Sequence, residues 1–169
     1  IKVHVTGLAP RMRCQGELQV WSYDELKLVA DTAHELGIPV TGHCRGASSI
    51  RDAARAGFDL ILHATYMDEE ALEAVVEAKV PIVPTFTFQA NLADFGAQIN
   101  ASADTQKIFQ AEIEDSAVML KRAFDAGVPL LCGTESGFSI TPYGEWHYRE
   151  IEVFVQDIGL TPLEAIRAA

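Results

Sequence analysis

Hydrophobic positions along the chain follow two spacings, and the change from one to the other recurs four times. Stretches with apolar residues three and four positions apart, which is the spacing of an amphipathic helix, are followed by short apolar runs typical of strands. Each of these runs begins with Gly or Lys, at the place where a helix would end in a left-handed residue. Aligned on that residue, the four repeated segments are 37–43, 57–63, 79–85 and 127–133.

The helices carry start signals of their own. Ser22 with Glu25 forms a capping box, Asp68 precedes an apolar-periodic run, and Thr161 stands before Pro162 at a first helical position. Strands that alternate with helices at spacings near 20 residues run parallel and are joined by crossovers, which predicts an α/β fold. The predicted strands cover about 1–5, 38–42, 58–63, 80–85 and 128–133, and helices are predicted after Ser22, over 69–78, 104–126 and 145–157, and from 162 onward.

Two stretches fit neither spacing. Residues 86–103 are too long for an ordinary connection between elements, and the stretch 7–21 is similar. Long connections without secondary structure are often functional, so both are candidate active-site loops.

Alternation along the strands decides which side chains share a face. One face would place His43 and His63 in the same register at the ends of consecutive strands, with Lys2 and Glu135 on the same side. Neighbouring strands lie about 4.8 Å apart, so two such imidazoles can converge on one metal ion. If the strands close into a barrel, Lys2 lies inside it. Burying an unpaired ammonium group there costs free energy, so its presence calls for a chemical role. The opposite face, packed under the helices, would carry Val40, Phe58, Leu60, Leu62, Val128, Leu130 and Cys132.

Composition and charge narrow the class of partner. The 169 residues, 49% hydrophobic and 22% charged, have an ordinary globular composition for one domain. A formal net charge of −11 argues against nucleic acid, because binding to phosphates depends on Lys and Arg. Three cysteines without CxxC spacing favour a reducing compartment, and no apolar run approaches the roughly 20 residues that span a bilayer. We therefore expect a cytoplasmic protein with a small-molecule substrate, no nucleic acid and no membrane as partners, and self-association into a homo-oligomer left open.

Five segments together resemble the amidohydrolase superfamily, in the branch of imidazolonepropionase-like enzymes, Xaa-Pro dipeptidases and aryl-urea or carbamate hydrolases. They are IKVHVTG at 1–7, TGHCRG at 41–46, LILHA at 60–64, GTESG at 133–137 and GLTPLEAI at 159–166. They span nearly the whole chain in the family's order. The resemblance implies a (β/α)8 TIM barrel of which residues 1–169 supply about strands 4–8. The first barrel half and a small β-sandwich domain built from both termini are then absent from this sequence. The true N-terminus is expected to lie upstream, since the chain opens in strand pattern without Met.

The resemblance also implies a ligand set. Lys2 would be carboxylated and bridge two metal ions, His43 and His63 would bind the second ion, and Glu135 would bind the first ion and handle the proton of the attacking water. The family usually has Asp in place of Glu135, and its first-strand His-x-His pair is absent here. Zinc fits ligation by histidine and carboxylate, although ligand type does not exclude iron or manganese.

These residues predict a metal-dependent hydrolase that cleaves a C–N bond in an amide, dipeptide, urea or carbamate. Arg45, His4 and Tyr143 are candidate substrate contacts, with a surface salt bridge, a hydrogen-bonded core histidine and a rim residue as the respective alternatives. A catalytically silent barrel fragment is the rival interpretation. A phosphate-binding barrel is disfavoured, because no GxGxxG or GxxxxGK[ST] motif occurs.

Overall fold

A parallel four-stranded sheet in the order β1-β2-β3-β4 forms the centre of the molecule, as the helix–strand alternation predicts. The strands are β1 (Lys2–His4), β2 (Thr41–Gly46), β3 (Leu60–Tyr66) and β4 (Ile82–Val83). A computed structural model describes residues 1–7 and 18–169, so most of the predicted loop over 7–21 lies outside the described residues. The α/β class and the parallel sheet are confirmed.

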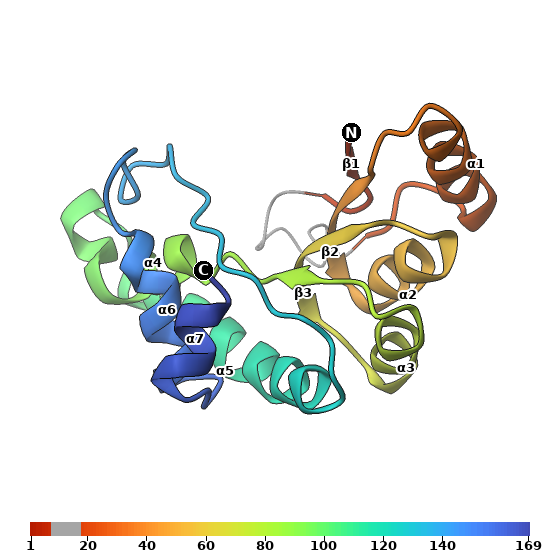
Figure 1. Cartoon of the computed structure of the whole chain (residues 1–169). Coiled ribbons are helices and arrows are strands. Elements are labelled where there is room, and N and C mark those ends of the chain that lie inside the picture. The colour runs from red at the N-terminus through yellow and green to blue at the C-terminus, as the bar shows by residue number, and fades with distance from the viewer. Residues whose placement is uncertain (8–17) are drawn as a thin grey trace.

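Three helices, α1 (Tyr23–Glu35), α2 (Ala47–Ala56) and α3 (Glu69–Ala78), lie side by side along one face of this sheet (Figure 1). The capping box before α1 forms as predicted, with the Ser22 hydroxyl accepting from the Glu25 amide and the Glu25 carboxylate accepting from the Ser22 amide. The Asp68 carboxylate accepts from the first turn of α3. Local capping by side chains therefore defines where α1 and α3 start.

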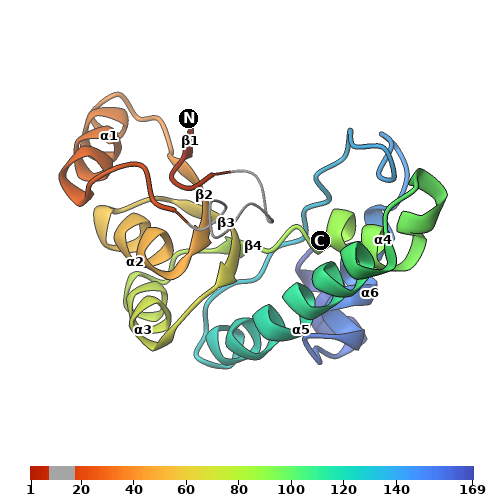
Figure 2. The same cartoon turned by 180° about the vertical axis from the view of Figure 1, so that it is seen from behind.

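A second group of helices lies beyond β4, where Figure 2 shows them from behind. It consists of α4 (Phe86–Phe95), the 3₁₀ turn η1 (Gly96–Ile99), α5 (Ala103–Asp125), α6 (His147–Gln156) and α7 (Pro162–Arg167). The helices predicted over 104–126, 145–157 and from 162 onward are confirmed with small shifts at their ends. None of the described helices is long and apolar enough to cross a membrane.

The prediction of an irregular loop over 86–103 is wrong, because this stretch forms α4 and η1. No local capping side chain marks the start of α4. Its first amides, from Phe86 and Thr87, instead donate to the buried carboxylate of Glu150 on α6, at 3.0 and 2.7 Å. A cap supplied from 64 positions away leaves no local signal in the sequence.

The fifth predicted strand, 128–133, is reduced to a single parallel bridge between Leu130 and Ile82. The amide of Ile82 donates to Pro129 O, and the amide of Leu131 donates to Ile82 O, both at 2.9 Å. Its partner β4 has only two residues and lies between Pro81 and Pro84, which lack the amide hydrogens that a longer ladder requires. The strand prediction is therefore wrong in length, although the segment occupies the expected place beside β4.

The prediction of which side chains of β3 face the helices is also wrong. The ladder pairs Val3 with Gly42, Gly42 with Ile61, and Ile61 with Ile82, and this row is buried under the helices. Leu60 and Leu62, expected on the packing face, share the opposite face with His43. The repeat alignment placed 41 opposite 61, whereas the structure places 41 opposite 60. A shift of one residue exchanges the two faces of a strand.

Gly133 lies so close to β4 that a side chain there would collide with it. An added Cβ would stand 2.4 Å from Val83 Cγ1 and 3.3 Å from Thr85 Cγ2. We expect Gly133→Ala to lower the free energy of unfolding by about 1–3 kcal/mol through overpacking, measured by denaturant titration. Val83→Ala removes the colliding methyl group, so the double variant should lose less than the sum of the two single losses. Strictly additive losses would contradict this account.

Candidate metal centre

Two buried imidazoles meet between the neighbouring strands β2 and β3, which contain His43 and His63. His43 and His63 are 4% and 3% exposed, and their ring centroids lie 4.4 Å apart with the planes at 72°. His43 Nδ1 and His63 Nε2 face each other at 2.8 Å. The two histidines singled out in the sequence are therefore brought together.

The repeat predicted that His43 and His63 converge because they share a register. The structure shows a different cause. His43 pairs with Leu62 in the ladder, and His63 pairs with Cys44. Regular alternation would then turn the two imidazoles to opposite faces of the sheet. The backbone prevents this, because His63 and Ala64 have φ values of 75° and 52° and the register shifts after Cys44. Left-handed geometry at non-glycine residues is uncommon and often marks functional sites.

The outer nitrogen of each imidazole has a partner that determines its tautomer. His43 Nε2 lies 3.1 Å from Gly7 O, a carbonyl that can only accept, so Nε2 carries the hydrogen. His63 Nδ1 lies 2.6 Å from Thr85 Oγ1, whose own hydrogen is donated to Pro84 O at 2.6 Å. Thr85 Oγ1 therefore accepts from His63 Nδ1. In the neutral rings, the inner nitrogens His43 Nδ1 and His63 Nε2 are both left with lone pairs.

Two lone pairs at 2.8 Å repel each other unless a proton or a cation lies between them. Burial lowers the pKa of His43 to about 4 and that of His63 well below its usual value, so a shared proton is disfavoured near neutral pH. A metal ion held at about 2.0–2.1 Å from each nitrogen satisfies both atoms. Ligating histidines commonly donate their other N–H to a carbonyl or similar acceptor, as both rings do here.

Glu135 and Lys2 lie near this pair. Glu135 Oε1 is 3.6 Å from His63 Nε2, and burial raises the pKa of Glu135 while the charges of Lys2 and Arg45 oppose the rise. Lys2 is exposed on β1, two positions before His4 on the same strand face. No group of three or more His, Cys, Asp and Glu side chains in the described parts of the chain is arranged to hold a metal ion. The donor set that fits an ion is thus the histidine pair, with Glu135 beside it.

Arg45 forms a buried ion pair, not the surface salt bridge considered as its alternative role. Its Nη2 lies 3.1 Å from Glu112 Oε1, and both side chains are almost inaccessible to solvent. Glu112, on α5, also accepts from Tyr66 OH at 2.6 Å and from Gln89 Nε2 at 3.3 Å. Arg45 Nε is buried with no hydrogen-bond partner among the described residues. The Nε–H of the guanidinium is therefore buried and unsatisfied by any described residue.

His4 and Tyr143, the other two candidate substrate contacts, are in different surroundings. The exposed ring of His4 lies 5.0 Å from that of His43, beside the centre. Tyr143 is 82% exposed on the loop after Glu135. The sequence analysis missed Thr85, Glu112 and Glu150, whose partners lie 22 to 67 positions away. The one available signal in the sequence is a charged or hydroxyl side chain at a position where the helix or strand pattern predicts a buried apolar residue.

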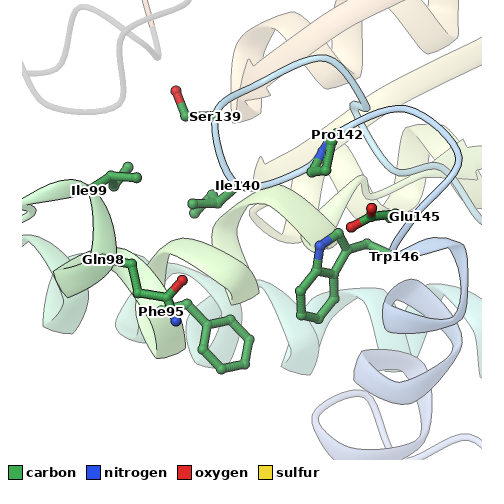
Figure 3. A pocket seen from close by; sticks show the side chains of 8 residues that line it. All are labelled: Phe95, Gln98, Ile99, Ser139, Ile140, Pro142, Glu145 and Trp146. Carbon is green, nitrogen blue, oxygen red and sulfur yellow. The ribbon is translucent and has the colours of Figure 1, made fainter.

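The loop that carries Glu135 also lines a pocket of about 390 Å³ at the far end of α4. Figure 3 shows its aromatic wall, formed by Phe95 and Trp146, whose ring centroids lie 5.4 Å apart. None of the residues of the histidine pair or Glu135 lines it, so it is separate from the candidate centre. Its lining residues are Phe95, Gln98, Ile99, Ser139, Ile140, Pro142, Glu145 and Trp146.

No family model matches the chain, but similar sequences and similar solved structures are known. Ochratoxinase from Aspergillus niger is 31% identical over 179 residues, covering 100% of this chain and 34% of its own length. Its crystal structure matches with a TM-score of 0.80 and 28% identity, over 100% of this chain and 37% of that one. The chain belongs to the amidohydrolase superfamily.

Further proteins match the chain in sequence or in fold. An uncharacterized protein of Mycobacterium tuberculosis is 31% identical over 156 residues, or 89% of this chain and 40% of its own length. A crystal structure of a Xaa-Pro dipeptidase with bound methionine has the same fold, with a TM-score of 0.79 at 24% identity over 99% of this chain and 41% of that one. An uncharacterized metal-dependent hydrolase from Pyrococcus furiosus matches with a TM-score of 0.61 at 22% identity, over 98% and 36%. The chain thus spans 34% to 40% of these curated relatives.

The Arg45–Glu112 pair gives a test of the site's packing. Removing one partner of a buried ion pair leaves an uncompensated charge, so Glu112→Gln should lower the free energy of unfolding by about 3–5 kcal/mol. Replacing both residues with Met should cost less, because no charge is then left buried. Thermal and denaturant unfolding of the three proteins measures this. A single variant as stable as the parent would show that the pair does not contribute as described.

Proposed function

We propose that this chain carries the second metal site of a metal-dependent hydrolase of the amidohydrolase superfamily. The observation that supports it most directly is the pair of imidazole lone pairs facing each other at 2.8 Å, with both outer nitrogens already engaged. In this proposal His43 and His63 bind a divalent ion, for which zinc is a suitable candidate. A second ion would be held by Glu135 and by Lys2 in its carboxylated form.

The same proposal assigns barrel positions to the strands. Strands β1 to β4 and the segment 128–133 correspond to strands 4–8 of a (β/α)8 barrel, with the open edge at β1 completed by an earlier half of a longer protein. His43 lies within β2, His63 within β3, and Glu135 shortly after the segment 128–133, and active sites of such barrels are built toward the C-terminal ends of the strands. The coverage of 34% to 40% of the curated relatives is in keeping with this assignment.

Bound divalent ions would lower the pKa of a coordinated water and polarise a scissile carbonyl. Glu135 would accept the proton of that water and return it to the leaving nitrogen. Gly7 O and Thr85 Oγ1 would keep the imidazoles in the tautomers that leave their inner nitrogens free.

The substrate in this proposal is a small molecule with a C–N bond, such as an amide, dipeptide, urea or carbamate. The names of the relatives include ochratoxinase and Xaa-Pro dipeptidase, and a bottromycin amidohydrolase has a similar structure. Arg45, two positions after His43, remains a proposed substrate contact. His4 and Tyr143 remain proposed contacts at the exposed side of the site.

Metal content separates this proposal from a catalytically silent fragment. The full-length protein should contain about one or two divalent ions per chain by elemental analysis, and a chelator should abolish hydrolysis of amide, dipeptide or urea substrates. His63→Ala should lower the metal content, since it removes a ligand. Purified protein with no stoichiometric metal and with hydrolysis unaffected by chelators would refute the mechanism.

Glu135 gives the second test. Glu135→Gln retains the size of the side chain but removes the proton-accepting carboxylate, so kcat should fall by roughly 10²–10⁴ while the fold is retained. Glu135→Asp shortens the reach by one methylene group, and kcat should also fall if the site is adapted to Glu. Steady-state kinetics measure both. A Gln variant with most of the parent's kcat would remove Glu135 from the mechanism.

A further inference from the structure

We infer that Glu150, on α6 and outside the metal centre itself, is a positioning residue that frees the Thr85 hydroxyl to orient His63. The expected effects on metal affinity rest on the function proposed above. Glu150 is fully buried, at 0% exposure, and forms no ion pair with any described residue. A buried carboxylate without a cationic partner is costly unless its hydrogen bonds compensate.

Those hydrogen bonds all come from the start of α4. Glu150 Oε1 accepts from Phe86 N at 3.0 Å, and Oε2 accepts from Thr87 N at 2.7 Å and from Thr87 Oγ1 at 2.8 Å. The first amides of a helix have no partners within the helix and favour a negative charge nearby. Glu150 therefore does for α4 what a capping side chain normally does.

Thr85 occupies the capping position of α4 but does not cap it. A threonine at this position normally has extended backbone geometry and accepts from an amide two or three residues later. Thr85 instead has φ 61° and ψ 42°, and its side chain makes no capping hydrogen bond. Its hydroxyl lies 2.6 Å from His63 Nδ1 and donates to Pro84 O.

The two residues thus divide one task between them. Because Glu150 satisfies the amides of Phe86 and Thr87, the Thr85 hydroxyl is not drawn into the helix and stays on His63. Hydrogen bonds to the outer nitrogen fix the tautomer and orientation of a ligating histidine. Without Glu150, the amides of Phe86 and Thr87 would lack an acceptor, and the Thr85 hydroxyl would be drawn toward them to cap α4.

A double-mutant cycle on the full-length protein tests this, with Zn²⁺ as the probe. Partners of this kind typically contribute 10–100-fold to metal affinity, so Glu150→Gln and Thr85→Val should each weaken Zn²⁺ binding by about that factor. The double variant should be no weaker than the weaker single variant, because both changes act through one hydrogen bond. Thr85→Ser, which retains the hydroxyl, should bind Zn²⁺ like the parent. Competition with a chromophoric chelator measures the Kd at a temperature where circular dichroism shows every variant folded.

Asp68→Ala is the matched control. It removes a capping carboxylate from α3, at the neighbouring strand–helix turn, without touching Thr85, and should leave the Kd for Zn²⁺ unchanged. Should Glu150→Gln not fold, Thr87→Val removes one of the three hydrogen bonds to Glu150 and should give a smaller loss of affinity in the same direction. Parent-like affinity in the Glu150 variant, or losses that multiply in the double variant, would overturn the inference.

A metal-free measurement separates this inference from the proposed function. In protein labelled with ¹⁵N-histidine and stripped of metal, His63 should carry its hydrogen on Nδ1 in the parent and show a weaker preference for that tautomer in Glu150→Gln and Thr85→Val, in which only the Pro84 carbonyl still accepts from the ring. The His43 signals should stay unchanged. If the parent binds no Zn²⁺, the proposed function fails while this readout still decides the role of Glu150. An unchanged His63 tautomer in both variants would refute it.

Discussion

The site depends on one constraint, which is that two imidazole nitrogens present lone pairs to the same point. Each outer nitrogen already has a hydrogen-bond partner, Gly7 O for His43 and Thr85 Oγ1 for His63, and with both outer hydrogens in place the inner nitrogens face each other as lone pairs. Burial opposes protonation of both rings. A cation is the species that best satisfies this arrangement, and the placement of Glu135 at 3.6 Å from His63 Nε2 adds a further acceptor beside it.

Backbone strain gathers around the same point. Of the seven non-glycine residues with positive φ in the described chain, four lie in or just after the segments that surround the histidine pair: His63, Ala64, Thr85 and Glu135. Each such residue costs on the order of 1–3 kcal/mol and persists only where its surroundings over-determine it. For His63 the strain has a visible result, because it turns the side chain back toward His43 against the alternation of the strand.

Buried carboxylates connect the second group of helices to this strained edge. Glu112 on α5 binds Arg45, which follows His43 on β2, and Glu150 on α6 holds the start of α4, which follows Thr85. Arg45 lies two positions after His43, and the amides bound by Glu150 lie one and two positions after Thr85, which contacts His63. The helices beyond β4 therefore do more than cover the sheet, since their polar side chains support the geometry of the strand ends.

The sequence alone determined what is encoded within a few neighbouring residues. Helix starts at Ser22, Asp68 and Thr161, the left-handed ends at Gly57 and Lys79, and the parallel α/β class follow from local spacing and capping. The segments around His43, His63 and Glu135 were enough to indicate the superfamily. Register is different, because one residue of slip exchanges the faces of β3, and only the packed sheet selects between the two.

Tertiary structure alone decided the contacts made across long separations. The cap of α4 comes from Glu150, 64 positions from Phe86, and the partner of Arg45 is Glu112, 67 positions away. Such pairs depend on where α5 and α6 pack, and a buried carboxylate in a helix gives no local sign of which amide or guanidinium it will meet. The convergence of His43 and His63 likewise depends on a backbone reversal that strand periodicity does not predict.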